Sequence, residues 1–214
     1  RLWDAKSPTP VDMSLFSSGQ YLKAVEQQAM AEAISKVLYP EDNHYEGKSL
    51  RLKQQYFFVS ATVQCICRQH KAEYGTLRNF HQKHVIQIND THPTLVIPEL
   101  MRILLDEEGY TWDDAWYIVT HTVAYTNHTV MAEALERWPQ QIIENLLPRI
   151  WQLLVEISNR YQKQLTDYFH GDMGRVEKLA IIWGGQVRMA NLCVCACYAV
   201  NGVFPRHDII KYYQ

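Results

Sequence analysis

The pattern of apolar and polar positions divides the chain into helical segments joined by polar turns. Residues 1–19 are mixed in character and predict an extended segment followed by a loop. Residues 21–38 contain no Gly or Pro and predict the first long helix, which ends because Tyr39 precedes Pro40. The apolar face of this helix is narrow, so we expect it to pack along one side only.

Helical spacing returns in later segments, where apolar residues recur every three or four positions. These segments are 50–70, 112–120, 131–139 and 140–169. The last of them carries Pro148 near its start, which predicts a break or kink there. The block 187–203 combines alternating cysteines with several alanines, and we interpret it as a helix after a short strand.

Two short β-branched runs each stop at a polar turn that contains a histidine. Residues 85–88 stop at the turn 89–93, after which a helical period resumes and ends at Gly109. Residues 122–125 stop at the turn 126–129. Strands that alternate with helices favour a helix-dominated α/β fold with mostly parallel strands. Ligands of such sheets bind beyond the carboxyl ends of the strands, so these two turns form the first candidate site.

The composition of the chain mainly excludes classes of function and partner. The chain has 214 residues, 47% of them hydrophobic, which is enough to bury a core. A net charge of −2 leaves no basic surplus, so nucleic acid and anionic membranes are poor candidate partners. No stretch approaches the roughly 18 consecutive apolar residues of a membrane helix, and the start RLWDAKSP lacks an initiator Met and a signal-peptide core. We therefore expect a soluble, cytoplasmic chain cut from a longer protein.

Cysteine and histidine spacing does not favour a metal site. The cysteines fall into two C-x-C clusters, 65–67 and 193–197, which favour reduced structural thiols over zinc ligands. His81 and His84 are three apart with no third ligand nearby, so no metal is expected there.

The two polar turns contain groups that suit sugar chemistry. Asp90 and His92 stand in a turn closed by Pro93, which would hold a carboxylate and an imidazole in fixed orientation. The alternative is that Asp90 or Thr91 caps the following helix and His92 only bonds to the backbone. His128 lies between short polar side chains suited to sugar hydroxyls, although a satisfied turn histidine is the competing interpretation.

A third candidate is the segment 40–48, which predicts an exposed loop between helices. Asp42 and Asn43 supply hydrogen-bonding groups beside His44 and Tyr45, whose rings would stack on a planar ligand. A purely solvated loop is the alternative.

Several strings of this sequence closely resemble successive segments of the glycogen and maltodextrin phosphorylases, α-1,4-glucan phosphorylases, in the same order. The strings are RLW, KVLYPEDN, EGK-x-LRLKQQYF, VIQINDTHPTLVIPELMRILLDE, AYTNHTVMAEALERWP, LLPR, VRMANLC and AVNGV. INDTHP and AYTNHT are long and unusual enough to make chance similarity untenable, and the resemblance spans nearly the whole chain.

The resemblance implies an enzyme, a glycosyltransferase that cleaves α-1,4 glucan by phosphorolysis to glucose 1-phosphate with help from pyridoxal phosphate. It implies a helix-rich piece of a Rossmann-like, glycosyltransferase-B type domain, with residues 1–214 as the C-terminal part of the phosphorylase N-terminal domain. Within it, 20–39 resembles the helix at the interface of a homodimer, 40–48 the active-site loop and 49–214 an α/β core portion.

The resemblance also assigns roles to the candidate residues. His128 is similar to the catalytic histidine that holds the glucosyl 6-hydroxyl, with its backbone carbonyl facing the positive charge that develops at the anomeric carbon. The expected glucan-binding residues are Asp42, Asn43, Asp90, His92, Thr129 and Glu136.

Departures from the family pattern concern regulation. His44 and Tyr45 stand where animal members have two aromatic residues, and Arg68-Gln69 stands where they have two arginines that bind an activating phosphate. One cation is missing, so Arg68 alone would hold a phosphate less well, which favours an unregulated enzyme.

The resemblance places the lysine that binds pyridoxal phosphate, and the basic residues for the substrate phosphate, in a following domain. We therefore expect this chain alone to be catalytically silent. The alternatives are an assembly module that dimerises through the first helix, and a glycan-binding domain outside the phosphorylases.

Overall fold

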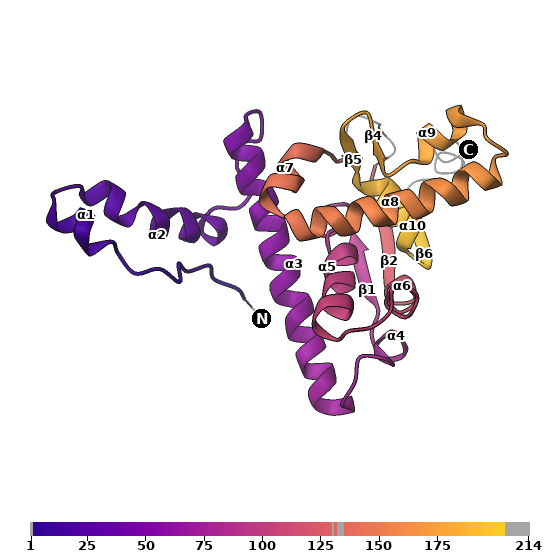
Figure 1. Cartoon of the computed structure of the whole chain (residues 1–214), viewed down its shortest axis with the longest axis horizontal. Helices are drawn as coiled ribbons and strands as arrows, with labels where there is room; N and C mark the ends of the chain where they lie inside the picture. Colours follow the sequence, from indigo (N-terminus) through magenta and orange to yellow (C-terminus); the bar gives the residue numbers. More distant parts are fainter. Residues whose placement is uncertain (1, 130, 132–134, 204–214) are drawn as a thin grey trace. The chain divides into compact units, whose positions relative to one another are not determined.

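The architecture comes from a computed structural model, which describes residues 2–129, 131 and 135–203. The chain forms two compact units, residues 1–61 and 62–214, and their boundary falls within the long helix α3 (Tyr45–Tyr74; Figure 1).

Unit 1 contains α1 (Met13–Ser17), α2 (Tyr21–Lys36) and the first part of α3. The Asp12 carboxylate caps α1 by accepting hydrogen bonds from the backbone N–H groups of Ser14 and Leu15. Helix α2 ends within two residues of the predicted position. Within α2, which the structure describes throughout, only Ala24 is buried, in agreement with the narrow apolar face.

The loop predicted at 40–48 is shorter than expected, because α3 begins at Tyr45. The imidazole of His44 explains the early start. Its Nδ1 accepts a hydrogen bond from the backbone N–H of Gly47 at 3.0 Å, which satisfies a donor in the first turn of the helix.

The segment between α3 and the first strand is short. Unit 2 contains the remaining elements. The elements are α4 (Phe80–Lys83), β1 (Ile86–Asn89), α5 (Val96–Arg102), the π-helix η1 (Ile103–Glu107), α6 (Trp112–Thr120), β2 (Val123–Asn127), β3 (Arg137–Pro139), α7 (Gln140–Leu146), α8 (Pro148–Tyr168), α9 (Met173–Leu179), β4 (Ile182–Trp183), β5 (Gln186–Arg188), α10 (Met189–Ala196) and β6 (Ala199–Gly202).

Strands β1, β2 and β6 form a parallel sheet in the order β1-β2-β6. The register pairs Asn89 with Thr126 and Asn127 with Gly202, so the carboxyl ends of the three strands meet at one edge. The predicted helix-rich α/β class is therefore confirmed, and this sheet is parallel as expected.

The two faces of this sheet differ in character. Ile88 and Tyr125, which are in register, are fully buried. Gln87, Asn89 and Asn201 are exposed and lie on the other face, where Gln87 Nε2 donates to Thr126 Oγ1 at 2.9 Å. Parallel sheets are usually buried on both faces, whereas this sheet has one face that carries exposed polar residues.

A second sheet, antiparallel in the order β3-β5-β4, corrects one prediction. The segment 131–139 was expected to be helical, but Arg137–Pro139 forms strand β3, and residues 132–134 lie outside the described residues. Trp138 is almost fully buried opposite Val187 of β5, so pairing with a distant strand overrides a short helical pattern. Gly184 and Gly185 form the turn that joins β4 to β5, and both have positive φ.

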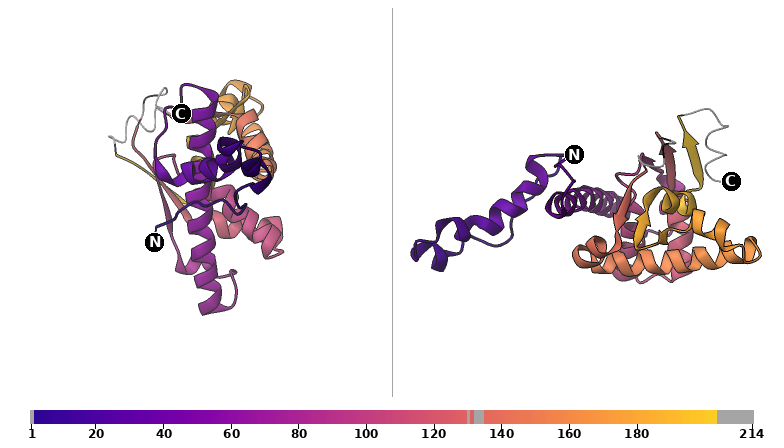
Figure 2. Two further views of the ribbon diagram at one scale, coloured as in Figure 1. Left: turned by 90° about the vertical axis from the view of Figure 1, so that its left-hand side faces the viewer. Right: turned by 90° about the horizontal axis from the view of Figure 1, so that it is seen from above.

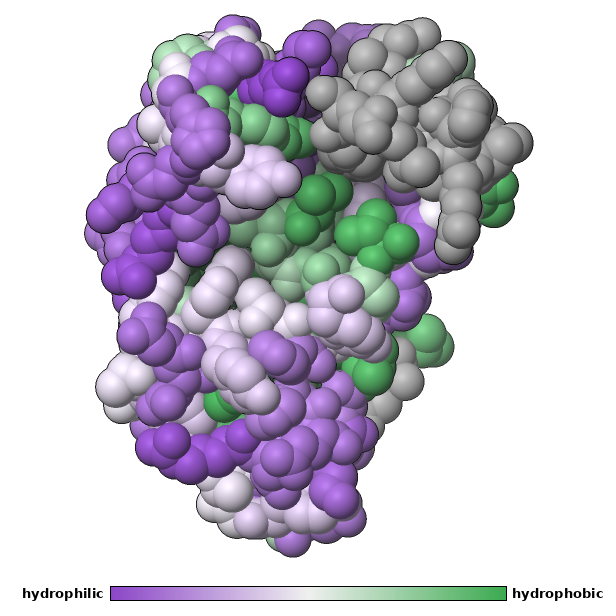
Figure 3. All heavy atoms as spheres, turned by 90° about the vertical axis from the view of Figure 1, so that its right-hand side faces the viewer, coloured by the Kyte–Doolittle hydropathy of each residue, from purple (hydrophilic) through white to green (hydrophobic). Residues whose placement is uncertain are grey.

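The helices pack around these strands and confirm the predicted break at Pro148. Helix α7 ends at Leu146 and α8 begins with Pro148 in its first turn, where a missing N–H is tolerated. Helix α8, a long orange helix in Figures 1 and 2, packs against α5, α7 and α9. On the side of unit 2 that faces the viewer in Figure 3, apolar residues gather near the centre, with hydrophilic residues to the left of them and below.

Candidate functional site

The two turns singled out by the sequence lie side by side at the carboxyl ends of neighbouring strands. Asp90 follows β1 and His128 follows β2. The backbone N–H of Asp90 donates to the carbonyl of Thr126 at 2.9 Å, which extends the strand pairing into the first turn.

A side-chain hydrogen bond connects the two turns directly. Nε2 of His128 lies 2.5 Å from Oδ1 of Asn89, and both side chains are exposed. Because an amide oxygen only accepts, this contact places the proton of the neutral imidazole on Nε2 and leaves Nδ1 as an acceptor. Asn89 lies in the turn that the sequence singled out, as the polar residue that ends the first β-branched run. Its bond to His128 was not predicted.

The turn after β2 is shaped by its own polar side chains. Asn127 is buried, and its Oδ1 accepts a hydrogen bond from the backbone N–H of Thr129 at 2.8 Å. Oγ1 of Thr129 accepts from the N–H of Met131 at 3.2 Å. Successive bonds of this kind fix the backbone around His128.

Asp90 adopts a left-handed backbone conformation with a φ of 63°, which Asp and Asn tolerate better than most residues. Its Oδ1 accepts from the N–H of Thr91 at 2.6 Å. The expected alternative, a cap on the following helix by Asp90 or Thr91, is wrong. Helix α5 begins at Val96 and its N-cap, Leu95, makes no side-chain cap bond. His92 is half-buried in the same turn.

A buried layer of small polar groups supports the Asp90 turn. Oγ1 of Thr94 donates to the carbonyl of Thr91 at 2.7 Å and lies 3.2 Å from Sγ of Cys193. Burial raises the pKa of the Cys193 thiol well above its usual range, and the charges of Cys197 and Asp90 add to this effect. Cys193 is therefore a protonated packing residue, and all five cysteines are free thiols.

Glu136 lies just before β3 and is half-buried. Its backbone carbonyl accepts a hydrogen bond from the N–H of Met189 at 3.2 Å, which attaches this residue to the start of α10. Helix α10 in turn packs against β2, the strand that ends at the His128 turn.

Asp42 and Asn43 belong to unit 1, in the loop before α3. Asp42 Oδ2 pairs with the guanidinium of Arg51 at 2.5 Å, and Asn43 Nδ2 donates to Glu41 at 2.6 Å. Both side chains thus have local partners that order the loop. Their predicted role in glucan binding stays a prediction.

Arg68 lies on an exposed face of α3, where its Nε donates to the carbonyl of Gln64 at 3.3 Å. Its weak regulatory role stays a prediction as well. Within the part of the chain that the structure describes, no cluster of three or more His, Cys, Asp or Glu residues is suited to hold a metal ion. In the same residues, no helix is long and apolar enough to span a membrane.

Comparison with known proteins decides the family. A family model described as carbohydrate phosphorylase matches residues 1–212. The chain belongs to the carbohydrate phosphorylase family. This phosphorylase chain is 48% identical, over 99% of its length, to the muscle forms of glycogen phosphorylase from Ovis aries and Bos taurus. It is 47% identical, also over 99% of its length, to glycogen phosphorylase 2 from Dictyostelium discoideum. The predicted family resemblance is confirmed.

The phosphorylase chain spans only part of these relatives. It covers 26% of the length of the two mammalian proteins and 22% of the Dictyostelium protein.

Proposed function

We propose that this chain supplies the glucose-binding side of the active site of an α-1,4-glucan phosphorylase, which releases glucose 1-phosphate from glycogen or maltodextrin. The family membership supports the reaction type. The observation that carries the proposed site is the bond between His128 and Asn89, which joins two turns at the edge of a parallel sheet where ligands of such sheets bind.

In this proposal His128 positions the sugar. Asn89 holds its Nε2, which leaves Nδ1 to accept a hydrogen bond from a glucosyl hydroxyl. Retaining phosphorolysis develops positive charge at the anomeric carbon, and fixed dipoles or carboxylates near that carbon stabilise it. The backbone carbonyl of His128 and the carboxylate of Asp90 are the groups we assign to that task. His92, Thr129 and Glu136 complete the lining in unit 2. Asp42 and Asn43, in unit 1, are the further residues that we assign to glucan binding.

Pyridoxal phosphate does not fit the described residues. A lysine that forms a Schiff base depends on burial or a neighbouring cation to lower the pKa of its ammonium group. No lysine among the described residues is buried. We therefore assign the cofactor, and the groups that bind the phosphate substrate, to other parts of the parent enzyme, and expect this chain alone to be inactive.

The test replaces His128 by Ala in the full-length protein that carries this chain. We expect phosphorolysis of maltodextrin to fall by roughly 100-fold in kcat/KM, because a misplaced sugar loses the benefit of orientation. His121→Ala is the matched control, since His121 is another exposed histidine, bonded to the carbonyl of Tyr117 at the end of α6. An unchanged rate for the His128 variant would remove the proposed role.

A second proposed role is dimerisation through α2, which is favoured by its exposed apolar residues. Tyr21, Leu22, Val25 and Met30 are all exposed on this helix. The free thiols fit a cytoplasmic location, where cysteines stay reduced.

A further inference from the structure

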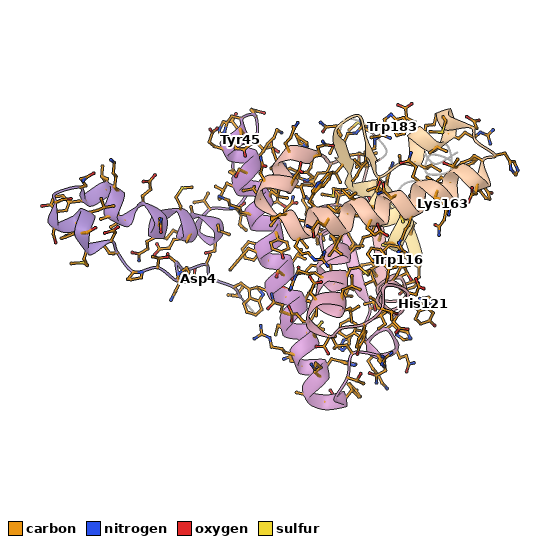
Figure 4. The ribbon with its side chains drawn as sticks, viewed as in Figure 1. Asp4, Tyr45, Trp116, His121, Lys163 and Trp183 are labelled. Atoms are coloured by element: carbon orange, nitrogen blue, oxygen red, sulfur yellow. The ribbon has the colours of Figure 1, made fainter. Side chains whose placement is uncertain are left out.

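Three rings, those of His81, Tyr117 and His121, gather at the amino ends of strands β1 and β2. His81 lies on α4, which precedes β1, and His121 is the C-cap residue of α6, which precedes β2. His121 is labelled in Figure 4. Because β1 and β2 are parallel, these rings lie at the end of the sheet opposite the turns of Asp90 and His128.

The two imidazoles are held close together around the ring of Tyr117. The ring centre of Tyr117 lies 3.9 Å from that of His121 and 5.2 Å from that of His81. The centres of the two imidazoles are 6.0 Å apart. Bonds of about 2.0–2.1 Å from one metal ion to two imidazole nitrogens set the ring centres about 5.2 Å apart at a tetrahedral angle and about 6.4 Å apart at a linear one. The observed separation lies within this range, so one ion fits between the two rings.

His121 already has the hydrogen bonding that is typical of a metal ligand. Its Nδ1 lies 2.7 Å from the backbone carbonyl of Tyr117. Because a carbonyl only accepts, Nδ1 carries the proton and the lone pair of Nε2 stays available. Histidines that bind metals usually donate their other N–H in this way, which fixes the tautomer and the orientation of the ring. The side chain is exposed, so an ion can approach it from solvent.

The imidazole of His81 is not committed to a structural hydrogen bond. His81 is half-buried, and in the described part of the chain its Nδ1 is buried without a hydrogen-bond partner. An unpaired buried nitrogen is costly, and a bound ion is one of the usual reasons for such a group. Burial, followed by the charge of His121, lowers the pKa of His81, so its imidazole is in the neutral, metal-binding form at pH 7.5.

Local spacing along the chain does not reveal this pair. It connects His81 with His84, but Nε2 of His84 lies 3.0 Å from Nδ1 of His70 and is occupied by that contact. The structure instead brings His121 to His81 by packing α6 against α4.

The two ligands select the class of ion. Imidazole nitrogens suit Cu²⁺, Ni²⁺ and Zn²⁺, whereas Mg²⁺ and Ca²⁺ require oxygen ligands. Two protein ligands are fewer than the three or four of resident zinc sites. Water would therefore fill the remaining positions, and binding would be reversible.

We propose that His81 and His121 together bind a divalent transition-metal ion, Cu²⁺, Ni²⁺ or Zn²⁺, at the amino end of the parallel sheet. The proposal does not depend on the proposed phosphorolysis, and no step of that reaction uses the ion. EDTA in the phosphorolysis assays keeps the metal site empty, so His121→Ala remains a valid control there.

The test is calorimetric titration of the 214-residue chain with NiCl₂ at pH 7.5, with ZnCl₂ and MgCl₂ in parallel. Ni²⁺ is the first probe because Cu²⁺ would oxidise the free thiols. We expect His121→Gln to weaken binding of Ni²⁺ and Zn²⁺ about tenfold or more, because loss of a ligand costs at least as much as the 10- to 100-fold loss typical of its hydrogen-bond partner. His81→Gln should have the same effect, and Mg²⁺ should not bind at this site.

The double variant separates a shared ion from two independent imidazoles. If one ion is shared, His81→Gln combined with His121→Gln should weaken binding little more than either substitution alone. The matched control is His170→Asn, which removes another exposed histidine, between α8 and α9. Its φ of 52° is one that Asn tolerates, so the fold is kept and binding should not change.

Three outcomes would overturn the proposal. One is that the parent chain binds neither Ni²⁺ nor Zn²⁺. Another is metal binding that His121→Gln leaves unchanged; this exposed position decides the matter even if the half-buried His81 variant does not fold. The third is a loss in the double variant equal to the sum of the two single losses in binding free energy, which would mean that the histidines bind separate ions.

Discussion

At the residue scale, one buried histidine shows how a polar group is kept in this core. His70 is almost fully buried, with Nδ1 3.0 Å from Nε2 of His84 and Nε2 2.9 Å from Oδ1 of Asn79. The amide oxygen only accepts, so Nε2 of His70 carries the proton and its Nδ1 accepts from His84. Nδ1 of His70 therefore carries no proton in this arrangement. An added proton on Nδ1 of His70 would face the donor of His84.

This histidine pair predicts a loss of stability in acid. Burial, followed by the charge of His70, lowers the pKa of His84, and burial followed by His121 lowers the pKa of His81. The unfolded chain then binds more protons than the folded chain, so the free energy of unfolding falls as pH drops below about 6.5. His84→Gln should reduce the difference between urea midpoints measured at pH 7.5 and pH 5.5.

The exposed residue Gln82, on the same short helix α4, provides the control. Gln82→Ala should keep the full pH dependence. If His84→Gln keeps it as well, the histidine pair is not its source.

The sequence predicted the two turns of the candidate site but not all of their contacts and conformations. The turns of Asp90 and His128 were visible because each combines a strand end with a histidine and small polar residues. The bond between Asn89 and His128 was missed because the two residues are 39 positions apart along the chain, and a local pattern of residues does not reveal such a pairing. The left-handed conformation of Asp90 was equally invisible, since Asp adopts it in a minority of turns.

At the element scale, the strongest predictions concerned segments with local signals. Helix α6 begins and ends at the predicted residues because Thr111 caps it and its apolar spacing is regular. Pro148 separated α7 from α8 for an equally local reason. Strand β3 and the π-helical turn η1 were missed, because β3 depends on pairing with β5 and π-turns carry no reliable sequence signal.

A bidentate ion pair connects two of these elements. Nε and Nη2 of Arg149, on α8, donate to the two carboxylate oxygens of Asp106, on η1, at 2.8 and 2.6 Å. The bond from Arg149 lowers the pKa of Asp106. This stabilisation is therefore present at neutral pH and is lost as acid protonates the carboxylate.

Arg149→Ala should lower the free energy of unfolding by about 1 kcal/mol at neutral pH. This value is at the upper end of the range for exposed ion pairs, because the contact is bidentate. Urea unfolding measures the change. Arg175→Ala is the comparison, since the ion pair of Arg175 with Asp172, the N-cap residue of α9, is a longer contact of 3.4 Å and should contribute little. Equal effects of the two substitutions would contradict the special role of the bidentate geometry.

At the scale of the whole molecule, the sequence predicted the α/β class but not the division into two units or the second sheet. The division falls inside α3, a continuous helix that gives no change of pattern at residue 61. The antiparallel sheet depends on strands of two or three residues, which are too short to produce a period.

Self-association is the prediction that belongs to this scale. If α2 forms the proposed dimer contact, the chain should sediment as a dimer at high concentration and dissociate on dilution. Leu22→Glu places a charge on the exposed apolar side of α2 and should keep the chain monomeric. Tyr168→Glu changes an exposed apolar residue at the end of α8 and serves as the control. A parent chain that is monomeric at every concentration would exclude the dimer.

The backbone of Asp90 limits which residues can replace it without cost. At its positive φ, glycine is relaxed and asparagine is tolerated, while alanine is strained. Asp90→Gly therefore deletes the carboxylate and spares the turn, whereas Asp90→Ala removes the carboxylate and distorts the turn together. The defect of Asp90→Gly therefore reports the loss of the carboxylate, and any further defect of Asp90→Ala reports the strain in the chain.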